Sequence, residues 1–326
     1  MVVAYGRLPA YSGATVPASD RLPARKREAG SSHVQAAVPG FGNPHAVREK
    51  IPMWCLAGAA LLTSACAAAT QSSVRDGAHA PRIVTLMPSF AEDVCAIGAG
   101  AQLAGVSEYT NAPCARGAVR VGNFAAIDAE RIVALHPDAV MAIPAQRVLT
   151  APLQRAGIRI VFAPDDSLHD IFLDIRTAGR ITAHAVQASA LVARLQRETA
   201  ALRASERGVR RPSVFVVVQA RPIWTVGPTS YISTLLQLAG ARNAVTALAR
   251  PYAQYNAEAL VRLQPDAVVA ASDLQSLLDG QPWISLRAVR QHHVFFLSDP
   301  DILERPGPRY NDGLRWLIAR LRPLSR

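Results

Sequence analysis

Two glutamates are the first candidates for chemistry, because they occupy the same position in a repeated segment. Residues 128–142 and 256–270 share alanine, glutamate, valine, leucine and a Pro-Asp-Ala-Val run at identical spacing, so that Glu130 corresponds to Glu258. In each copy the pattern predicts a helix that ends at the proline, followed by a buried strand. The repeat therefore places a glutamate at the matching position of two similar α/β units. A carboxylate in the first turn of a helix interacts favourably with the helix dipole, which gives each glutamate a local role.

The other reactive side chains do not form a familiar catalytic or metal-binding pattern. The chain has no Gly-x-Ser-x-Gly, no His-Glu-x-x-His and no phosphate-binding glycine loop. Its later histidines are not spaced with acidic residues as a closed metal site requires, and His292-His293 favours a surface turn before a strand. Asp165-Asp166 is interpreted as the cap of the helical segment that follows. We expect no enzyme activity, no metal site and no resident cofactor; an exported enzyme is the remote alternative.

Four cysteines are present, and two of them lie in the segment 47–66. The other two, Cys95 and Cys114, could form a disulfide in an oxidising compartment. The alternative is a buried thiol in a helix and an unpaired thiol in a loop, because spacing alone does not bring two sulfur atoms together.

The N-terminal part of the chain predicts export. Residues 1–46 have no periodicity and are interpreted as unstructured or as a wrongly annotated leader, with translation starting at Val47 or Met53. Residues 47–66 combine a short basic flank with an uncharged apolar run, as in an export signal; a membrane anchor is the alternative. The run ends at Cys66 like a bacterial lipoprotein signal, except for Thr63 where leucine is usual. We expect a periplasmic protein, either anchored through lipidated Cys66 or cleaved within the alanines that follow.

Length and charge narrow the class of protein further. The chain has 326 residues, enough for two domains with separate cores, and a formal net charge of +11. The arginines are scattered and no basic run alternates with aromatic residues. We therefore expect no binding to nucleic acid.

The apolar pattern of the sequence predicts alternating strands and helices, which would position the candidate residues. Strands are expected at 82–86, 103–107 and 159–162, then at 214–218 and 294–297, with a capping box of Ser89 and Glu92 before the first helix. Residues 219–228 are expected to form a loop. Apolar positions at helical spacing over 167–207 predict one continuous helix of about 25 residues, or about 38 Å. The resulting organisation is a linker (67–80), an N-terminal lobe (81–178), a connecting helix (179–207) and a C-terminal lobe (208–326).

The order of these elements resembles one family. Residues 81–89, 103–107, 132–140, 153–158 and 283–290 are similar to the helical-backbone substrate-binding proteins of bacterial ABC importers for cobalamin, haem and ferric siderophores. The resemblance extends over 81–326 and is strongest to the cobalamin-binding members. It implies an α/β fold of two similar lobes with parallel-type sheets, joined by one long helix, with a ligand cleft between the lobes. It also implies a monomer whose Glu130 and Glu258 dock on arginines of a twofold-symmetric ABC permease.

The same resemblance suggests a ligand site. A corrin or haem ring is flat and largely apolar, which suits aromatic side chains, whereas arginines could meet propionate or phosphate groups. The family positions that face the ligand correspond here to Tyr109, Phe124, Trp224 and Tyr252, and Ser89, Arg305 and Arg309 are further candidates for ligand binding.

The sequence departs from the family at several of these positions, which leaves the ligand open. Phe124 and Tyr252 stand where tryptophan is usual, and Ala112 and Ile143 replace aromatic residues. For the aromatics the alternative is core packing, and for the arginines it is a solvated surface charge. We expect a periplasmic protein that binds a cobalamin-like corrinoid for transport, with haem or a ferric siderophore as the alternative ligand; a tyrosine could then be the axial ligand of haem iron.

Overall fold

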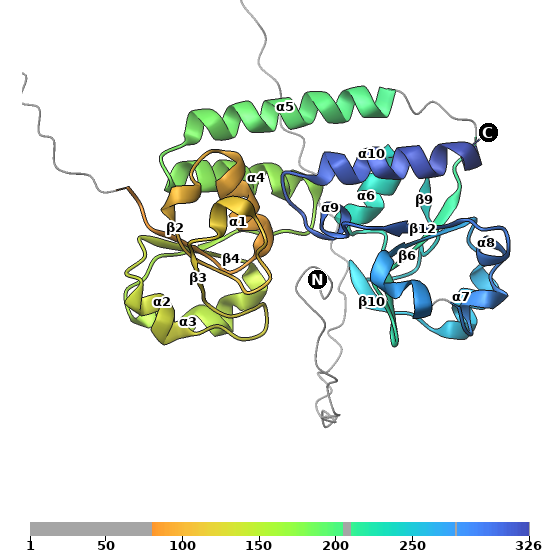
Figure 1. Cartoon of the computed structure of the whole chain (residues 1–326), viewed down its shortest axis with the longest axis horizontal. Helices are drawn as coiled ribbons and strands as arrows, with labels where there is room; N and C mark the ends of the chain where they lie inside the picture. Colours follow the sequence, from red (N-terminus) through yellow and green to blue (C-terminus); the bar gives the residue numbers. More distant parts are fainter. Residues whose placement is uncertain (1–79, 205–209, 278, 326) are drawn as a thin grey trace, which may run out of the picture. The chain divides into compact units, whose positions relative to one another are not determined.

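Separate sheets divide the folded part of the chain into an N-terminal and a C-terminal lobe (Figure 1). The computed structural model describes residues 80–204, 210–277 and 279–325, which all belong to one compact unit. The predicted leader, export signal and lipidation site at Cys66 lie outside the described residues. Within the described part, no helix is long and apolar enough to cross a membrane.

The N-terminal lobe is built on a five-stranded parallel sheet with the order β3-β2-β1-β4-β5. Its central strands are fully buried because helices cover both faces, as the runs of apolar residues predicted. The strands are β1 (Ile83–Thr85), β2 (Leu103–Val106), β3 (Val119–Arg120), β4 (Ala139–Ala142) and β5 (Ile160–Phe162). The helices are α1 (Pro88–Ala96), α2 (Ala129–Ala134), α3 (Arg147–Arg155) and α4 (Leu168–Ile181), with short 3-10 turns at Gly100–Gln102, Pro113–Ala115 and Pro144–Gln146.

The C-terminal lobe repeats a parallel sheet, with the order β12-β11-β6-β9, and adds a small antiparallel sheet, β10-β8-β7. The predicted loop over 219–228 is therefore wrong, because Ile223, Thr225 and Val226 are buried and form part of a hairpin. The strands are β6 (Ser213–Val217), β7 (Gln219–Ala220), β8 (Ile223–Val226), β9 (Arg242–Asn243), β10 (Tyr252–Gln254), β11 (Ala267–Ala271) and β12 (Val294–Leu297). The helices are α6 (Tyr231–Leu238), α7 (Ala257–Leu263), α8 (Arg287–Arg290), α9 (Asp301–Glu304) and α10 (Tyr310–Leu321), with 3-10 turns at Ser272–Leu277, Trp283–Ser285 and Arg322–Ser325.

The repeated segment (residues 128–142 and 256–270) has the same structural role in both lobes. Its N-caps, Asp128 and Asn256, each accept a hydrogen bond from the backbone amide three residues later, at 2.9 Å in both cases. The aspartate after the proline joins the repeat strand to its neighbour: the carboxylates at positions 138 and 266 accept bonds from the amides of Arg82 (2.7 Å) and Ser213 (2.8 Å). Each copy thus supplies a capped helix, a central strand and a carboxylate that fixes the adjacent strand.

Two helices, rather than the predicted single one, follow the N-terminal sheet. Helix α4 ends at Ile181, and α5 (Ala185–Ala204) begins after a turn in which Ala183 has a φ of +59°. The connecting helix predicted over 179–207 is α5, but it begins only at Ala185, because the chain turns back after α4 and Gly179 packs against Ala188 of α5. The predicted cap at Asp165-Asp166 is also wrong: Ser167 caps α4 in a capping box with Asp170.

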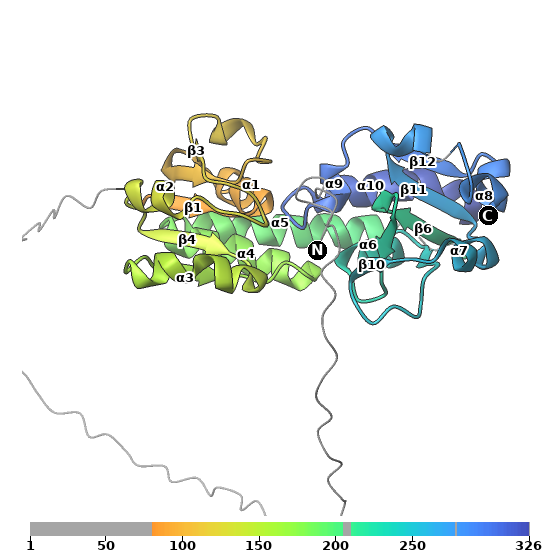
Figure 2. The ribbon, with the colours of Figure 1, turned by 90° about the horizontal axis from the view of Figure 1, so that it is seen from below.

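Helix α5 is attached to both lobes (Figures 1 and 2). On one side it packs along α4, and on the other the Thr199 hydroxyl lies 2.6 Å from the Tyr310 hydroxyl and 2.9 Å from Oδ1 of Asn311, both on α10. Arg315 of α10 also forms an ion pair with Glu198 at 3.1 Å. At 20 residues, α5 extends about 30 Å.

One apolar core runs through both lobes by way of α5, and each lobe has a second core on the far side of its sheet. In β6, Val214 and Val216 enter the shared core, whereas Phe215 and Val217 enter the second core of the C-terminal lobe. This alternation is what a strand buried on both faces requires. The two lobes are therefore joined by continuous packing as well as by the chain.

Candidate functional site

A buried arginine joins the two lobes. Arg305 follows α9, and its side chain is 6% exposed. Its guanidinium forms an ion pair with Glu92 of α1 at 3.0 Å and donates hydrogen bonds to Oδ1 of Asn111 (2.7 Å) and to the carbonyl of Tyr109 (3.0 Å). Asp301 balances the remaining charge, with 3.0 Å between its Oδ1 and Nε of the arginine.

Arg309 strengthens the same connection. Its Nε and Nη2 each lie 3.3 Å from an oxygen of Glu92, and its Nη1 lies 2.8 Å from Asp299. Burial alone would lower the pKa of Arg309, but Glu92 and Asp299 raise it above the usual value, so the cation is held firmly. We call the set Glu92, Asn111, Asp299, Asp301, Arg305 and Arg309 the interlobe clasp.

The interlobe clasp corrects two predictions. The capping box of Ser89 and Glu92 is wrong, because α1 begins one residue earlier at Pro88 and the carboxylate of Glu92 turns to the C-terminal lobe. Ser89 lies buried inside the helix, and its hydroxyl has no hydrogen-bond partner among the described residues. Neither Arg305 nor Arg309 is a solvated surface charge, since carboxylates of the protein already neutralise both.

A cavity of about 400 Å³ adjoins the interlobe clasp. Arg309 lines this cavity, but Tyr109, Phe124, Trp224 and Tyr252 do not. The lining residues are Glu92, Cys95, Ala96, Asn111, Ala112, Pro113, Asp299, Pro308 and Arg309. The cavity is therefore formed by α1 and by the segments at residues 111–113, 299 and 308–309, separately from the predicted aromatic residues.

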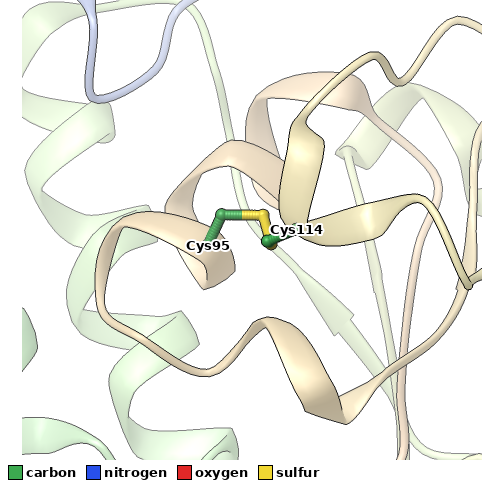
Figure 3. Close-up of a disulfide and its surroundings, with 2 residues drawn as sticks. All are labelled: Cys95 and Cys114. Carbon is green, nitrogen blue, oxygen red and sulfur yellow. A yellow bond between two sulfur atoms is a disulfide. The ribbon is translucent and has the colours of Figure 1, made fainter.

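A disulfide holds one of these loops. Cys95 at the end of α1 is bonded to Cys114, with their Cα atoms 5.9 Å apart (Figure 3). Gly100 leaves room for it, because a side chain at that position would overlap Cys114. The loop between the two cysteines carries Tyr109 and Asn111, so the disulfide and the interlobe clasp fix the same segment.

Two of the predicted aromatic residues lie on one face of the small antiparallel sheet. Strand pairing places Gln254 opposite Trp224 and Tyr252 opposite Val226, and positions two apart on a strand face the same way. Trp224 and Tyr252 are both half-buried. Burial raises the pKa of Tyr252, as do the nearby carboxylates of Asp165, Asp166 and Glu304. Tyr252 therefore lies where the segment before α4 meets the C-terminal lobe.

The other two aromatic candidates come from the N-terminal lobe. Tyr109 is exposed, and its backbone carbonyl is held by Arg305. Phe124 is half-buried and packs against the shared core. The structure thus groups Tyr109 with Arg305, and Trp224 with Tyr252.

Two buried carboxyl groups were not singled out by the sequence. Asp93 of α1 and Asp174 of α4 have no hydrogen-bond partner for either oxygen among the described residues. Burial raises the pKa of Asp174 to about 9, with further contributions from Asp165 and Asp170, and burial together with Asp174 raises that of Asp93. Asp174 occupies the apolar stripe of its helix between Ile171 and Ile175, and that spacing was the available signal.

Glu130 and Glu258 are both exposed, and each borders a shallow apolar hollow. The N-terminal hollow has a volume of 410 Å³ and the C-terminal hollow 500 Å³. The charges differ: Glu258 lies 3.9 Å from Arg262, whereas no described residue forms an ion pair with Glu130. The N-terminal hollow is lined by Ala129, Glu130, Val133, Ala134, His136 and Pro152, and the C-terminal hollow by Ala257, Glu258, Val261, Arg262, Gln281 and Pro282.

Among the described residues, no three His, Cys, Asp or Glu side chains lie close enough together to hold a metal ion. The two adjacent histidines behave as a turn: His292 has a φ of +58°, and Nδ1 of His293 lies 3.2 Å from the carbonyl of Asp266.

The sequence matches one known family over most of its described residues. Residues 83–300 match the family described as periplasmic binding protein. An uncharacterised ABC transporter substrate-binding lipoprotein of Bacillus subtilis (strain 168) is 28% identical over 256 residues, 74% of this chain and 80% of that protein.

Two solved structures show the same fold at a similar level of identity. The periplasmic vitamin B12-binding protein of Vibrio cholerae has a TM-score of 0.68 and 27% identity, covering 76% of this chain and 98% of that one. A periplasmic haem-binding protein from Pseudomonas aeruginosa has a TM-score of 0.65 and 28% identity, covering 76% and 94% of the two chains.

Proposed function

Because the chain belongs to the periplasmic binding protein family, we propose that it captures a cobalamin-like corrinoid in the periplasm and delivers it to an ABC permease. The observation that carries this proposal is the match to the vitamin B12-binding protein of Vibrio cholerae over nearly the whole of that chain. Two lobes on a shared helix, with an aromatic pair where they meet, suit a large planar ligand.

The charges near the candidate site favour a corrinoid over haem. Haem carries two propionates, and the arginines that could bind them, Arg305 and Arg309, are already paired with carboxylates. Haem remains the second candidate, because the exposed Tyr109 could be an axial ligand of its iron.

A titration of the purified protein tests the ligand. Cyanocobalamin should give saturable one-to-one binding by calorimetry, and a ferric hydroxamate should give no heat. If haemin gives a Soret band with the protein and binds more tightly than cyanocobalamin, the ligand is haem rather than a corrinoid.

Replacing Trp224 by alanine should weaken cyanocobalamin binding about tenfold or more, because an aromatic contact and its buried area are lost. The matched control is Trp316→Ala, since Trp316 is also half-buried but lies on α10 beside Arg320. Calorimetry on both variants, with thermal unfolding to check the fold, gives the comparison. If both substitutions weaken cyanocobalamin binding equally, Trp224 does not contact the ligand.

We infer that Glu130 and Glu258 dock on two basic sites of a twofold-symmetric permease. Both are exposed and identically placed in the repeat, and exposed charges act mainly on the rate of encounter. Arg262 partly offsets the charge of Glu258, so Glu130 should contribute more.

The double variant E130Q/E258Q should associate with the permease at least tenfold more slowly at low salt and lose most of its salt dependence. Of the single variants, E130Q should be the slower. Association rates on permease in lipid nanodiscs measure this, with Glu108→Gln as the control because Glu108 is exposed elsewhere on the N-terminal lobe. Unchanged rates for the double variant would leave the glutamates with their helix-dipole role alone.

A further inference from the structure

The two hollows beside Glu130 and Glu258 correspond to each other in composition. Each one places alanine, glutamate and valine from the repeat helix next to a proline from another element. The valines, Val133 and Val261, lie one helical turn after the glutamates. Val133 remains 39% exposed, so an apolar side chain faces solvent beside the charge.

The prolines show that the two hollows resemble each other beyond the repeated segment. Pro152 lies inside α3, whereas Pro282 directly precedes the turn Trp283–Ser285. Neither belongs to residues 128–142 or 256–270, and the elements that carry them differ in type. The two lobes thus complete the same kind of apolar hollow from unlike segments, which duplication of the repeat alone does not require.

We propose that each hollow receives an apolar side chain of the permease, adjacent to the basic side chain that binds the glutamate. This inference rests on the proposed docking of the two glutamates. A twofold permease would present the same segment twice, and the protein offers two matching hollows, each with one carboxylate at its edge.

The apolar contact would also strengthen the ion pair beside it. Packing at the hollow excludes water from the glutamate, and a charge pair is stronger where water is excluded. The glutamate would then mainly set the rate of association with the permease, and the hollow would mainly set the rate of dissociation.

The test compares permease binding by V133T/V261T with binding by V148T/V186T. Threonine keeps the shape of valine but places a hydroxyl in the hollow. The control valines, Val148 on α3 and Val186 on α5, are 85% and 80% exposed and line neither hollow. The probe is the ABC permease that the proposed function assigns to this protein, reconstituted in lipid nanodiscs.

We expect V133T/V261T to dissociate about 25-fold faster, roughly fivefold for each hollow, with an unchanged salt dependence of association. The V148T/V186T control should match the original protein. The variant V133I/V261I keeps an apolar side chain in each hollow and should dissociate as slowly as the original protein. A general loss of helix stability would not predict this difference from V133T/V261T.

Two outcomes count against the proposal and differ in what they overturn. If V133T/V261T dissociates like its control while E130Q/E258Q associates slowly, the hollows are not contact points and the docking role of the glutamates stands. If neither pair of substitutions changes binding, or the original protein does not bind the permease, the docking itself fails.

Discussion

Replacing Arg305 by methionine should destabilise the protein by about 3–5 kcal/mol, because the buried carboxylate of Glu92 would lose its closest cation. Glu92 is 7% exposed, so water cannot replace the arginine easily. Arg309 would remain near Glu92 at 3.3 Å, which places the expected loss towards the lower end of this range. Urea denaturation followed by circular dichroism measures the effect.

Arg315→Met is the matched control for this prediction. Arg315 also pairs with a glutamate of another element, Glu198, but it is half-exposed, and such pairs contribute less than about 1 kcal/mol. The double variant R305M/E92M should be more stable than R305M, since it also removes the buried carboxylate that lost its closest cation. Equal stabilities of R305M and R315M would show that the interlobe clasp does not join the lobes energetically.

Replacing Asp174 by asparagine should stabilise the protein at neutral pH and flatten its stability profile. The folded state raises the pKa of Asp174 from 3.8 to about 9, so the folded protein holds a proton that the unfolded chain releases. Stability from this group is complete below pH 3.8 and is lost as the pH rises towards 9. At pH 7 the loss is on the order of 4 kcal/mol, which the uncharged amide avoids.

Unfolding at several pH values checks this prediction. The difference between D174N and the original protein should be small near pH 4 and should grow steadily to pH 8. Asp93 packs in the same region and has its pKa raised partly by Asp174, so D174N should also lower the pKa of Asp93. Asp312→Asn, at an exposed site on α10, is the control and should show no such trend. A constant difference across the pH range would mean that Asp174 is already ionised in the folded protein.

The parallel sheets and the repeat could be predicted because their causes are local. Caps, helical spacing and the Pro-Asp step all lie within a few residues, and Asp138 and Asp266 fix neighbouring strands in the same way. Periodicity also marked most of the strands correctly, since their burial on both faces requires continuous apolar runs.

The errors arose where a distant residue decides the structure. Glu92 was assigned to a cap three residues away, but its cation, Arg305, is 213 positions further along the chain. The turn between α4 and α5 contains no proline or glycine, so nothing in its composition interrupts the helical pattern. Asp174 resembles a surface residue by type, and only the packing of α4 on α1 makes it buried.

Helix α5 packs in the shared core at one end and bonds to Tyr310 and Asn311 of α10 at the other. A ligand that touches both lobes therefore meets surfaces that are already arranged before it arrives. Little ordering of the protein remains to oppose binding, so affinity depends on how well the ligand complements a preorganised site. Selection among related macrocycles would then follow from shape rather than from adaptation by the protein.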